Sequence, residues 1–469
     1  MNKRIVHLYN RMPSGVQDVF ASARGLQLRR WRYGPETDAL VEAALERDSW
    51  SPAQWKPYQE ARLAYILERA AKHVPYYRDH WAARRRGGDQ AAVDVLANWP
   101  ILEKAPLRAN PQAFIAADCD PRTLYHIHTS GTTGTPVNVW WSRGMVREHY
   151  ALHEARARRW YGVDRHTPFA MLGGQLVVPV EKRTPPFWVR NHVMHQLYMS
   201  SYHLNRDHAP AYIAAIRAHG AQYILAYTSS LYTLAGYLLH MGIEPPPLKA
   251  IITNAEPVYD HQRDTIERAF RCPVYETYGQ AESVAFGSES PARYLHQWPE
   301  VGWIEIVEGD HPVPMGETGE IVTTGLLNEA MPLIRYRLGD RASLRPADPA
   351  SGRLLPLWGR IEGRNDDVLV TRDGRRIGRL DPIFKADLPI KEAQIVQKAL
   401  DHVLIRYVPD AGFAPEHERY IAAQLHMRMG ELRVSFEACA ALPRTQNGKL
   451  RAVISELSPE ARQQIEQQP

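Results

Sequence analysis

Cysteine is scarce in this chain of 469 residues, which contains only three: Cys119, Cys272 and Cys439. They lie far apart in the sequence, and no two of them form a CxxC pair. This scarcity argues against a disulfide framework and against a zinc site built from cysteines. We therefore expect a protein of a reducing compartment, with the cytoplasm as the default location.

The chain also lacks a long hydrophobic run. A helix that spans a membrane needs about 18 or more consecutive apolar residues, and no such run occurs. The N-terminal stretch "MNKRIVHLYNRMPSG" contains no continuous apolar segment of the kind found in signal peptides. We expect neither a signal peptide nor a transmembrane segment.

A strong charge of either sign is missing as well. The 57 lysines and arginines nearly balance the 52 acidic residues, which leaves a net charge of +5. A nucleic-acid binder needs a concentrated basic stripe, so we expect no nucleic-acid partner. Hydrophobic residues make up 44% and charged residues 23%, which is typical of a soluble globular enzyme.

The pattern of apolar residues divides the chain into regions. Residues 1–100 are predicted to form a largely helical lead-in, because apolar positions repeat at helical spacing in "ARLAYILERAAKHVPYY". Between positions 212 and 279, strand-like and helical segments alternate with short connections, which predicts βαβ units and a mostly parallel sheet. Residues 300–360 carry short β-like pieces separated by turn residues, which predicts a small β subdomain.

A domain boundary is expected at "GRIEGRNDDVLV", where glycines and charged residues separate the β-rich region from the C-terminal part of the chain. We predict an α/β fold with an α+β tail. Residues 1–365 form a large N-terminal domain in which helices flank mostly parallel sheets. Residues 366–469 form a small C-terminal α+β domain.

The stretch "TSGTTGTP", from Thr129 to Pro136, offers hydroxyls and bare backbone but almost no apolar surface. One interpretation is a surface loop. The other is a phosphate cradle, because glycines let backbone amides approach an anion and the hydroxyls donate further hydrogen bonds. It is not a Walker motif, since no GKS or GKT ends it.

The order of six short motifs decides between these interpretations. "TSGTTGTP" is followed by "TNAEP", "YGQAE", "YRLGD", "GRNDD" and "PRTQNGK". With these motifs in this order, the chain resembles the adenylate-forming superfamily, which contains acyl-CoA synthetases, luciferases and nonribosomal adenylation domains. The stretches "RAAKHVPYYRDHW", "SSYHLNRDH" and "MPLIRYRLGD" are most similar to phenylacetate-CoA ligases and their CapK-type relatives.

The resemblance implies a nucleotide site and assigns roles within it. The phosphate loop would hold the β- and γ-phosphates, the turn at Ala255 would lie against adenine, and Tyr278 would stack on the purine. Asp340 would accept the ribose hydroxyls, and Arg364 would make a second ribose or phosphate contact. The implied nucleotide-binding residues are Thr129, Ser130, Gly131, Thr132, Thr133, Gly134, Ala255, Glu256, Pro257, Thr277, Tyr278, Gly279, Gln280, Asp340 and Arg364.

The implied catalytic residues are Lys449, Thr133 and Glu282. Glu282 resembles the Mg²⁺ ligand of the family, and one carboxylate suffices because phosphate oxygens and water complete the shell. Lys449 would enter the site during adenylation and stabilise the charge that develops at the α-phosphate. The C-terminal domain would rotate about Asp366 between the two half-reactions.

The implied activity is that of an AMP-forming ligase. ATP and Mg²⁺ would activate a small carboxylic acid as an acyl-adenylate, and the acyl group would pass to coenzyme A. An alternative keeps adenylation and delivers the acyl group to an amine, a carrier protein or a saccharide. A third hypothesis is a nucleotide-binding scaffold without catalysis, which the retained Glu282, Asp340 and Lys449 argue against. The sequence leaves the oligomeric state open, with a homodimer as one option.

Two departures from the family pattern matter. After the hinge, Gly378, Arg379, Leu380 and Asp381 replace apolar residues and a terminal Glu, which weakens the case for coenzyme A as acceptor. Several of the phenylacetate-ligase relatives that the chain resembles hold a structural zinc with Cys and His after the "YGQAE" region. Here His296 is present, but Ser290 stands where a cysteine is expected, so we predict no zinc.

One segment of the sequence is a candidate for the pocket that binds the acid. The segment around Phe187, Trp188, Tyr198 and Tyr202 is a candidate wall of the acyl pocket, with packing in the core as the alternative interpretation.

Overall fold

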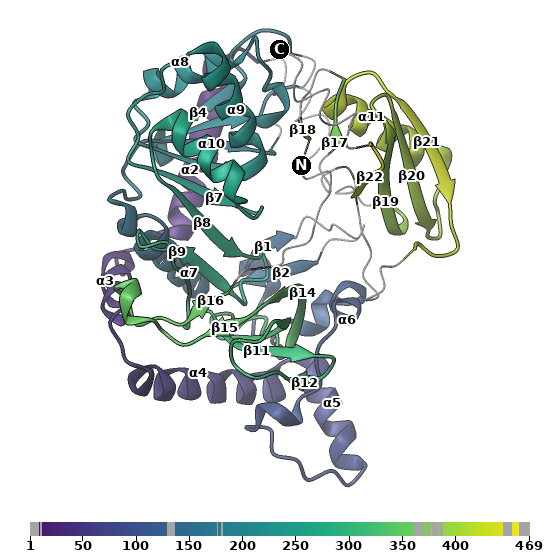
Figure 1. Ribbon diagram of the computed structural model, residues 1–469. Coiled ribbons are helices and arrows are strands. Elements are labelled where there is room, and N and C mark those ends of the chain that lie inside the picture. Colours follow the sequence, from purple (N-terminus) through teal and green to yellow (C-terminus); the bar gives the residue numbers. More distant parts are fainter. Residues whose placement is uncertain are drawn as a thin grey trace.

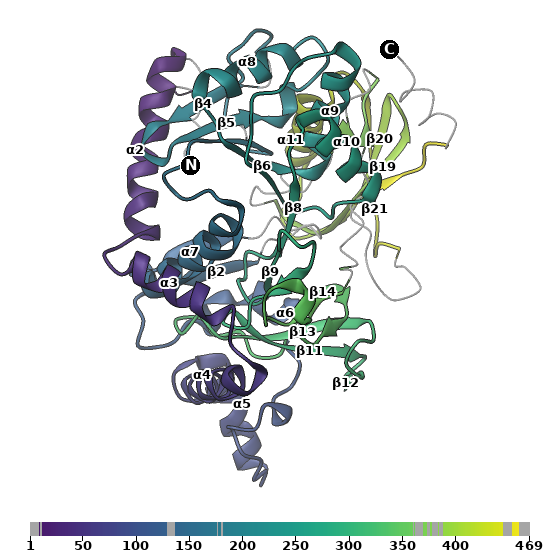
Figure 2. The same cartoon turned by 60° about the vertical axis from the view of Figure 1, so that its left-hand side comes forward.

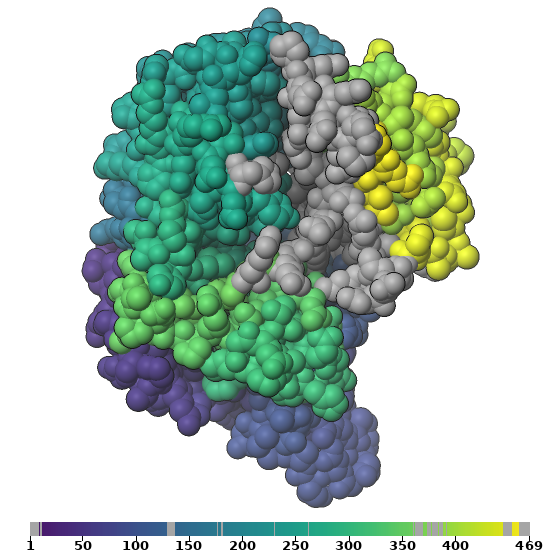
Figure 3. Space-filling view, viewed as in Figure 1, coloured from purple at the N-terminus to yellow at the C-terminus, as the bar shows by residue number. Residues whose placement is uncertain are grey.

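The computed structural model shows a large body with a smaller unit at its side (Figure 1). In the space-filling view this unit, which carries the yellow C-terminal elements, lies at the right of the larger body (Figure 3). The structure describes residues 9, 12–128, 137–175, 177–179, 182–359, 361, 369–372, 376–377, 383, 388–443 and 453–458. In these residues, no helix combines the length and the apolar character needed to cross a membrane.

Helices dominate the first hundred residues, as expected, and recur between the strands. The described α-helices are α2 (Ser14–Arg32), α3 (Thr37–Arg47), α4 (Pro52–His73), α5 (Pro75–Arg86), α6 (Lys104–Ala109), α7 (Arg143–Ala157), α8 (Ala209–His219), α9 (Thr228–Met241), α10 (Asp260–Phe270) and α11 (Pro415–Met429). The described 3₁₀ helices are η1 (Leu96–Asn98), η2 (Pro111–Phe114), η3 (Pro121–Thr123), η4 (Arg159–Tyr161), η5 (His192–Met194), η6 (Ser201–His203) and η7 (Pro349–Ser351).

A ten-stranded sheet forms the centre of the large body, in the order β15-β16-β10-β9-β8-β7-β6-β3-β5-β4. Strands β5, β3, β6, β7 and β8 are parallel, and the strands at both edges are antiparallel. Its strands are β3 (Phe169–Gly173), β4 (Trp188–Asn191), β5 (Gln196–Ser200), β6 (Tyr223–Tyr227), β7 (Ala250–Asn254), β8 (Val274–Gly279), β9 (Phe286–Glu289), β10 (Leu295–Gln297), β15 (Leu344–Arg345) and β16 (Leu357–Trp358). The α/β prediction is confirmed.

The parallel strands present different residues to the two faces of the sheet, because side chains alternate along a strand. Ile224 and Ala226 pack with apolar residues of α8, α9 and α10 on one face. Tyr223 and Leu225 belong to a second apolar cluster on the opposite face. Figure 2 shows α2 beside β4, at the edge of the same sheet.

Glycines end the two helices that precede the strands β6 and β7. Gly220 follows α8 with φ 68°, and Gly242 follows α9 with φ 63°. This left-handed conformation carries no steric penalty in glycine and lets the chain turn back toward the sheet. Both helix ends therefore follow from a glycine in the sequence.

Smaller sheets complete the molecule. An antiparallel sheet of order β12-β11-β13-β14 lies within the predicted β-rich region, and β1 pairs with β2. The C-terminal unit has the order β21-β20-β19-β22 with α11 packed on it, and β17 pairs with β18. The strands are β1 (Tyr125–His128), β2 (Asn138–Trp141), β11 (Gly302–Glu308), β12 (His311–Pro312), β13 (Gly319–Gly325), β14 (Tyr336–Ala342), β17 (Leu369–Val370), β18 (Arg376–Ile377), β19 (Ile390–Ala399), β20 (His402–Pro409), β21 (Arg433–Ala438) and β22 (Val453–Ser455).

The C-terminal unit contacts the large body through a buried arginine. The guanidinium of Arg428, on α11, lies 5.3 Å from the centre of the Tyr202 ring, in η6. Both side chains are buried. The domain boundary at 365/366 stays a prediction, because residues 362–368 lie outside the described residues.

A buried ion network fixes α7 in the large body. Arg156 donates to Asp48 at 2.7 Å and to both carboxylate oxygens of Glu300 at 2.7 and 2.9 Å. Trp160 also donates to Asp48, at 2.8 Å. The side chains of Arg156 and Glu300 are fully buried, so each charge depends on its partners for stabilisation.

We expect Arg156→Met to lower the free energy of unfolding by about 3–5 kcal/mol, because it leaves Glu300 buried with one fewer partner. Urea unfolding followed by circular dichroism measures this loss. The matched control is Arg271→Met, since Arg271 pairs with Glu244 where both side chains are exposed. A loss in Arg156→Met no greater than that of the control would show that the network does not hold α7.

Candidate active site

The carboxyl ends of β6, β7 and β8 meet at one edge of the large sheet. In the parallel register Tyr227 stands beside Asn254, and Thr253 beside Glu276. The segments that follow β7 and end β8 therefore come together, although they are about twenty residues apart in sequence. Ligands of parallel sheets bind at such strand ends.

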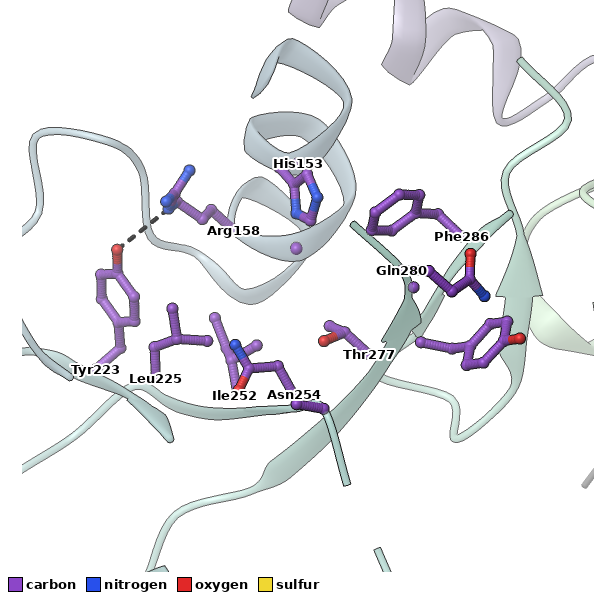
Figure 4. A pocket seen from close by; sticks show the side chains of 13 residues that line it. His153, Arg158, Tyr223, Leu225, Ile252, Asn254, Thr277, Gln280 and Phe286 are labelled. Carbon is purple, nitrogen blue, oxygen red and sulfur yellow. Dashed lines mark hydrogen bonds between the residues drawn. The ribbon is translucent and has the colours of Figure 1, made fainter. Parts of the chain in front are cut away.

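A cavity of about 230 Å³ opens at these strand ends. Five residues predicted from the motifs line it: Ala255, Thr277, Tyr278, Gly279 and Gln280. In Figure 4, His153 and Arg158 approach from α7 and the chain following it, while residues of the strands lie opposite them. The cavity therefore lies between α7 and the sheet.

The backbone at both strand ends has a geometry that only certain residues tolerate. Ala255 has φ 68°, which is strained for a residue with a Cβ atom and is typical of functional turns. At Gly279, a Cβ atom would lie 2.0 Å from the ring of Phe286, so only glycine fits. Thr277 donates from Oγ1 to the carbonyl of Thr253 at 2.7 Å, which joins β8 to β7.

Tyr278 and Asp340 are brought into direct contact. The hydroxyl of Tyr278, on β8, donates to Asp340, on β14, at 3.0 Å. The Tyr278 ring also packs edge-on against Trp358 at 5.6 Å between centres. Two residues that the motifs predict to bind adenine and ribose thus lie together, although they belong to different sheets.

Glu282 is held in place by a tyrosine that the sequence reasoning missed. The hydroxyl of Tyr336 donates to Glu282 at 2.9 Å, and both side chains are buried. Tyr336 begins the "YRLGD" motif, so the motif itself carried the signal. In the described residues, no group of three His, Cys, Asp or Glu side chains is placed to hold a metal ion.

One carboxylate still fits Mg²⁺, because this ion takes most of its ligands from phosphate and water. Glu282 therefore stays the predicted ligand.

His296, by contrast, is buried on β10 with its ring edge-on to Trp160, and Ser290 is buried nearby in the sequence. The prediction of no zinc is not tested by this arrangement.

Glu256 and Pro257 follow β7 in the turn that begins at Ala255. The carbonyl of Glu256 accepts a hydrogen bond from Thr228 Oγ1 at 3.3 Å, which joins this turn to the start of α9. Neither residue lines the cavity.

Several predicted residues lie outside the described residues. They are Thr129 to Pro136, Arg364, Asp366, the residues 378–381, and Lys449. The flanks of the first segment are described: His128, the last residue of β1, pairs with Asn138, the first residue of β2. The roles given to these residues stay predictions.

Three polar atoms in the cavity lining have no hydrogen-bond partner within the described part of the chain. They are the side-chain oxygen of Asn254 and both amide atoms of Gln280. Buried polar atoms are nearly always paired in folded proteins, with protein, water or ligand. Their position at the strand ends indicates a polar ligand there.

The other half of the cavity comes from residues that sequence reasoning did not select. Helix α7 and the residue after it contribute His153, Ala157 and Arg158, while β6 and β7 contribute Tyr223, Leu225 and Ile252. The spacing of His149, His153 and Ala157 places them on one helix face, which was the available signal. None of Phe187, Trp188, Tyr198 or Tyr202 lines this cavity, and Phe187 is fully buried in the core against His203.

The two histidines of α7 are neutral near the cavity. Burial lowers the pKa of His149 to about 3, and it lowers the pKa of His153 well below its usual range. His149 bonds to the hydroxyl of Ser283 at 3.0 Å, and both imidazoles pack against Phe286. His153, which lines the cavity, therefore presents an uncharged imidazole to it.

Comparison with known proteins identifies the class. The AMP-binding enzyme family model matches residues 56–328, more than half of the chain, and the CapK C-terminal domain model matches residues 369–456. The chain belongs to the AMP-binding enzyme family and is an AMP-forming ligase. The predicted resemblance to the adenylate-forming superfamily, in its phenylacetate-CoA ligase and CapK branch, is confirmed.

Relatives share about a quarter of their residues with the chain. Protein CapK of Staphylococcus aureus is 25% identical over 460 residues, which cover 96% of this chain and 99% of CapK. Phenylacetate-coenzyme A ligase of Pseudomonas putida is 27% identical over 335 residues, which cover 68% of this chain and 72% of that enzyme.

The fold is shared with a solved structure of 2-hydroxyisobutyryl-CoA ligase in complex with 2-HIB-AMP and CoA, in its thioesterification state. The TM-score is 0.56 at 20% identity, and the match covers 90% of this chain and 94% of that one.

We expect Asp340→Ala to weaken binding of a non-hydrolysable ATP analogue about tenfold or more, because hydrogen bonds to a charged group contribute about 1.5–3 kcal/mol. Isothermal titration calorimetry measures the affinity. Asp264→Ala, at an exposed position on α10, serves as the control and should bind like the unmodified protein. Equal affinities in all three proteins would contradict the ribose role of Asp340.

The buried His149 predicts a pH dependence of stability. Its pKa is about 3 in the folded chain but about 6.5 in the unfolded chain, so falling pH protonates the unfolded form first. The free energy of unfolding should therefore fall as pH drops below about 6.5, by up to about 1.4 kcal/mol per pH unit for this group.

In His149→Gln that contribution disappears, so the decline between about pH 6.5 and about pH 4.5 should be shallower than in the unmodified protein. Urea titrations across this range measure both slopes. His166→Gln, at an exposed position, should keep the unmodified slope. A parallel decline in His149→Gln and the unmodified protein would refute a neutral, buried His149.

Proposed function

We propose that this chain uses ATP to activate a small carboxylic acid and then transfers the acyl group to the thiol of coenzyme A. The observation that carries the proposal is the cavity at the ends of β7 and β8. There, polar atoms of Asn254 and Gln280 have no hydrogen-bond partner among the described residues, and the hydrogen-bonded pair of Tyr278 and Asp340 lies beside them. Family membership supports the same reaction.

In the first half-reaction, an oxygen of the acid attacks the α-phosphorus of ATP and pyrophosphate leaves. The acid is already ionised at neutral pH, so the reaction needs no histidine base. Asp340 orients the ribose and Tyr278 holds the orientation of Asp340, since their side chains are hydrogen-bonded. Bound Mg²⁺, with Glu282 as its protein ligand, would supply positive charge to the phosphate oxygens.

In the second half-reaction, a thiol attacks the carbonyl carbon of the acyl-adenylate and AMP leaves. Lys449 is proposed for the first step and Asp366 as the hinge between the steps. Thr129 to Gly134, with Thr133 in a catalytic role, are proposed to hold the phosphates, and Arg364 is proposed to contact the ribose or a phosphate. The cytoplasm stays the predicted location.

A second candidate has the same first step and a different acceptor: an amine, a carrier protein or a saccharide. The observation that favours it is the match to protein CapK, which spans 96% of this chain, whereas the match to a phenylacetate-coenzyme A ligase spans 68%. Incubation of the enzyme with an acid library, ATP and either coenzyme A or hydroxylamine separates the two. Hydroxamate formation without consumption of coenzyme A would select the second candidate.

We expect Lys449→Ala to lower pyrophosphate release roughly a hundredfold or more, because it removes a positive charge aimed at the developing negative charge. Release is measured with the acid that the unmodified enzyme uses best. Lys398→Ala is the matched control, since Lys398 also belongs to the predicted C-terminal domain of residues 366–469 and pairs at the surface with Glu456. Unchanged release in Lys449→Ala would remove this lysine from the mechanism.

A further inference from the structure

The cavity extends from the strand ends down the face of the sheet. Tyr223 begins β6 and stands beside Ala250, while Tyr227 ends β6 and stands beside Asn254. Four residues of strand separate these levels, which is about 13 Å at the usual rise per residue. Because both Asn254 and Tyr223 line the cavity, an acid bound with its carboxylate at the strand ends would point its far end toward Tyr223.

The middle of the cavity is apolar and its far end is polar. Ala157, Leu225 and Ile252 line the middle. At the far end, the Nε of Arg158 donates to the hydroxyl of Tyr223 at 3.2 Å (Figure 4). The Nη1 of the same guanidinium donates to Glu154 at 3.2 Å. An apolar pocket therefore ends at a guanidinium and a phenol hydroxyl.

The charges around this end do not cancel. Glu154 is fully buried and also lies 3.8 Å from both Arg159 and Arg165. Arg165 in turn pairs with Asp38 at 2.7 Å. These three arginines and two carboxylates carry one excess positive charge, because arginine stays protonated in proteins.

The hydroxyl of Tyr223 can also donate to a ligand. It accepts the hydrogen bond from Arg158, so its own proton is available to another acceptor. Burial raises the pKa of Tyr223, which keeps that proton in place at neutral pH. Stacking of its ring on Phe169, 4.9 Å between centres, fixes its direction.

We propose that Arg158 and Tyr223 determine the specificity of the acid, by selecting one that carries a hydrogen-bond acceptor at the end remote from its reacting carboxylate. This proposal rests on the proposed function. The preferred substrates are small acids with an apolar middle and a distal hydroxyl, carbonyl or carboxylate. A site built to pair with a polar group rejects the isostere that lacks it, because its own buried groups then go unpaired.

The test compares acids of nearly equal shape. Pyrophosphate release is measured with p-hydroxybenzoate against p-methylbenzoate, and with adipate against heptanoate. We expect kcat/KM to be at least tenfold higher for the acceptor-bearing acid in at least one pair. In Arg158→Met this ratio should fall toward one, mainly through a higher KM for the acceptor-bearing acid.

Arg159→Met is the matched control, because Arg159 is the neighbouring arginine, also approaches Glu154, and does not line the cavity. It should keep the unmodified ratio for the pair p-hydroxybenzoate and p-methylbenzoate, whose distal groups are uncharged, because it removes no group that lines the cavity. Tyr223→Phe keeps the ring and removes the hydroxyl, and it should lower the ratio at least threefold. This variant decides the test if the melting curve of Arg158→Met shows that Arg158→Met folds poorly.

Two failures are distinguishable. If acids of both kinds are adenylated with equal kcat/KM, or if Arg158→Met and Tyr223→Phe both keep the unmodified ratio, the specificity role is overturned while the proposed function stands. If no acid of any kind releases pyrophosphate, the proposed function fails and takes the specificity role with it.

Discussion

The buried arginine of α7 is the interaction on which the site depends. Arg156 ties α7 to Asp48, beyond the end of α3, and to Glu300, which precedes β11. The same helix also carries His153 and Ala157, which line the cavity. One helix thus carries both the charge that anchors it and part of the lining of the cavity over the sheet.

This arrangement explains why two kinds of residue share the cavity. The strand ends carry the motif residues, and their geometry is set by local backbone requirements such as the positive φ of Ala255 and the crowding at Gly279. The opposite wall comes from α7, whose position depends on contacts with residues that are distant in the sequence. Under the proposed function, nucleotide chemistry and acid recognition would occupy opposite ends of one space.

Local physical rules made much of the fold predictable from sequence. The helix ends at Gly220 and Gly242, the alternation of strands and helices, and the turn after β7 each depend on residues close in sequence. The motif order also predicted that Tyr278 and Asp340 serve one site, and they are hydrogen-bonded.

The end of the cavity at Arg158 and Tyr223, where we propose that the acid binds, was not predictable in this way. Arg158 and Tyr223 are separated by 65 residues, and each reads as an ordinary residue in its own segment. Their contact exists only because the fold brings the residue that follows α7 to the first residue of β6. The aromatic residue Phe187 was misleading for the related reason that a buried aromatic side chain looks the same in sequence whether it faces a core or a cavity.

The most direct test of the account is a crystal structure with a non-hydrolysable acyl-adenylate analogue. The account places adenine beside residues 255–257, the ribose hydroxyls on Asp340, and the acyl group beneath α7, over the neighbouring residues Leu225 and Ile252. Electron density for the acyl group outside that space, or a ribose that does not contact Asp340, would contradict it.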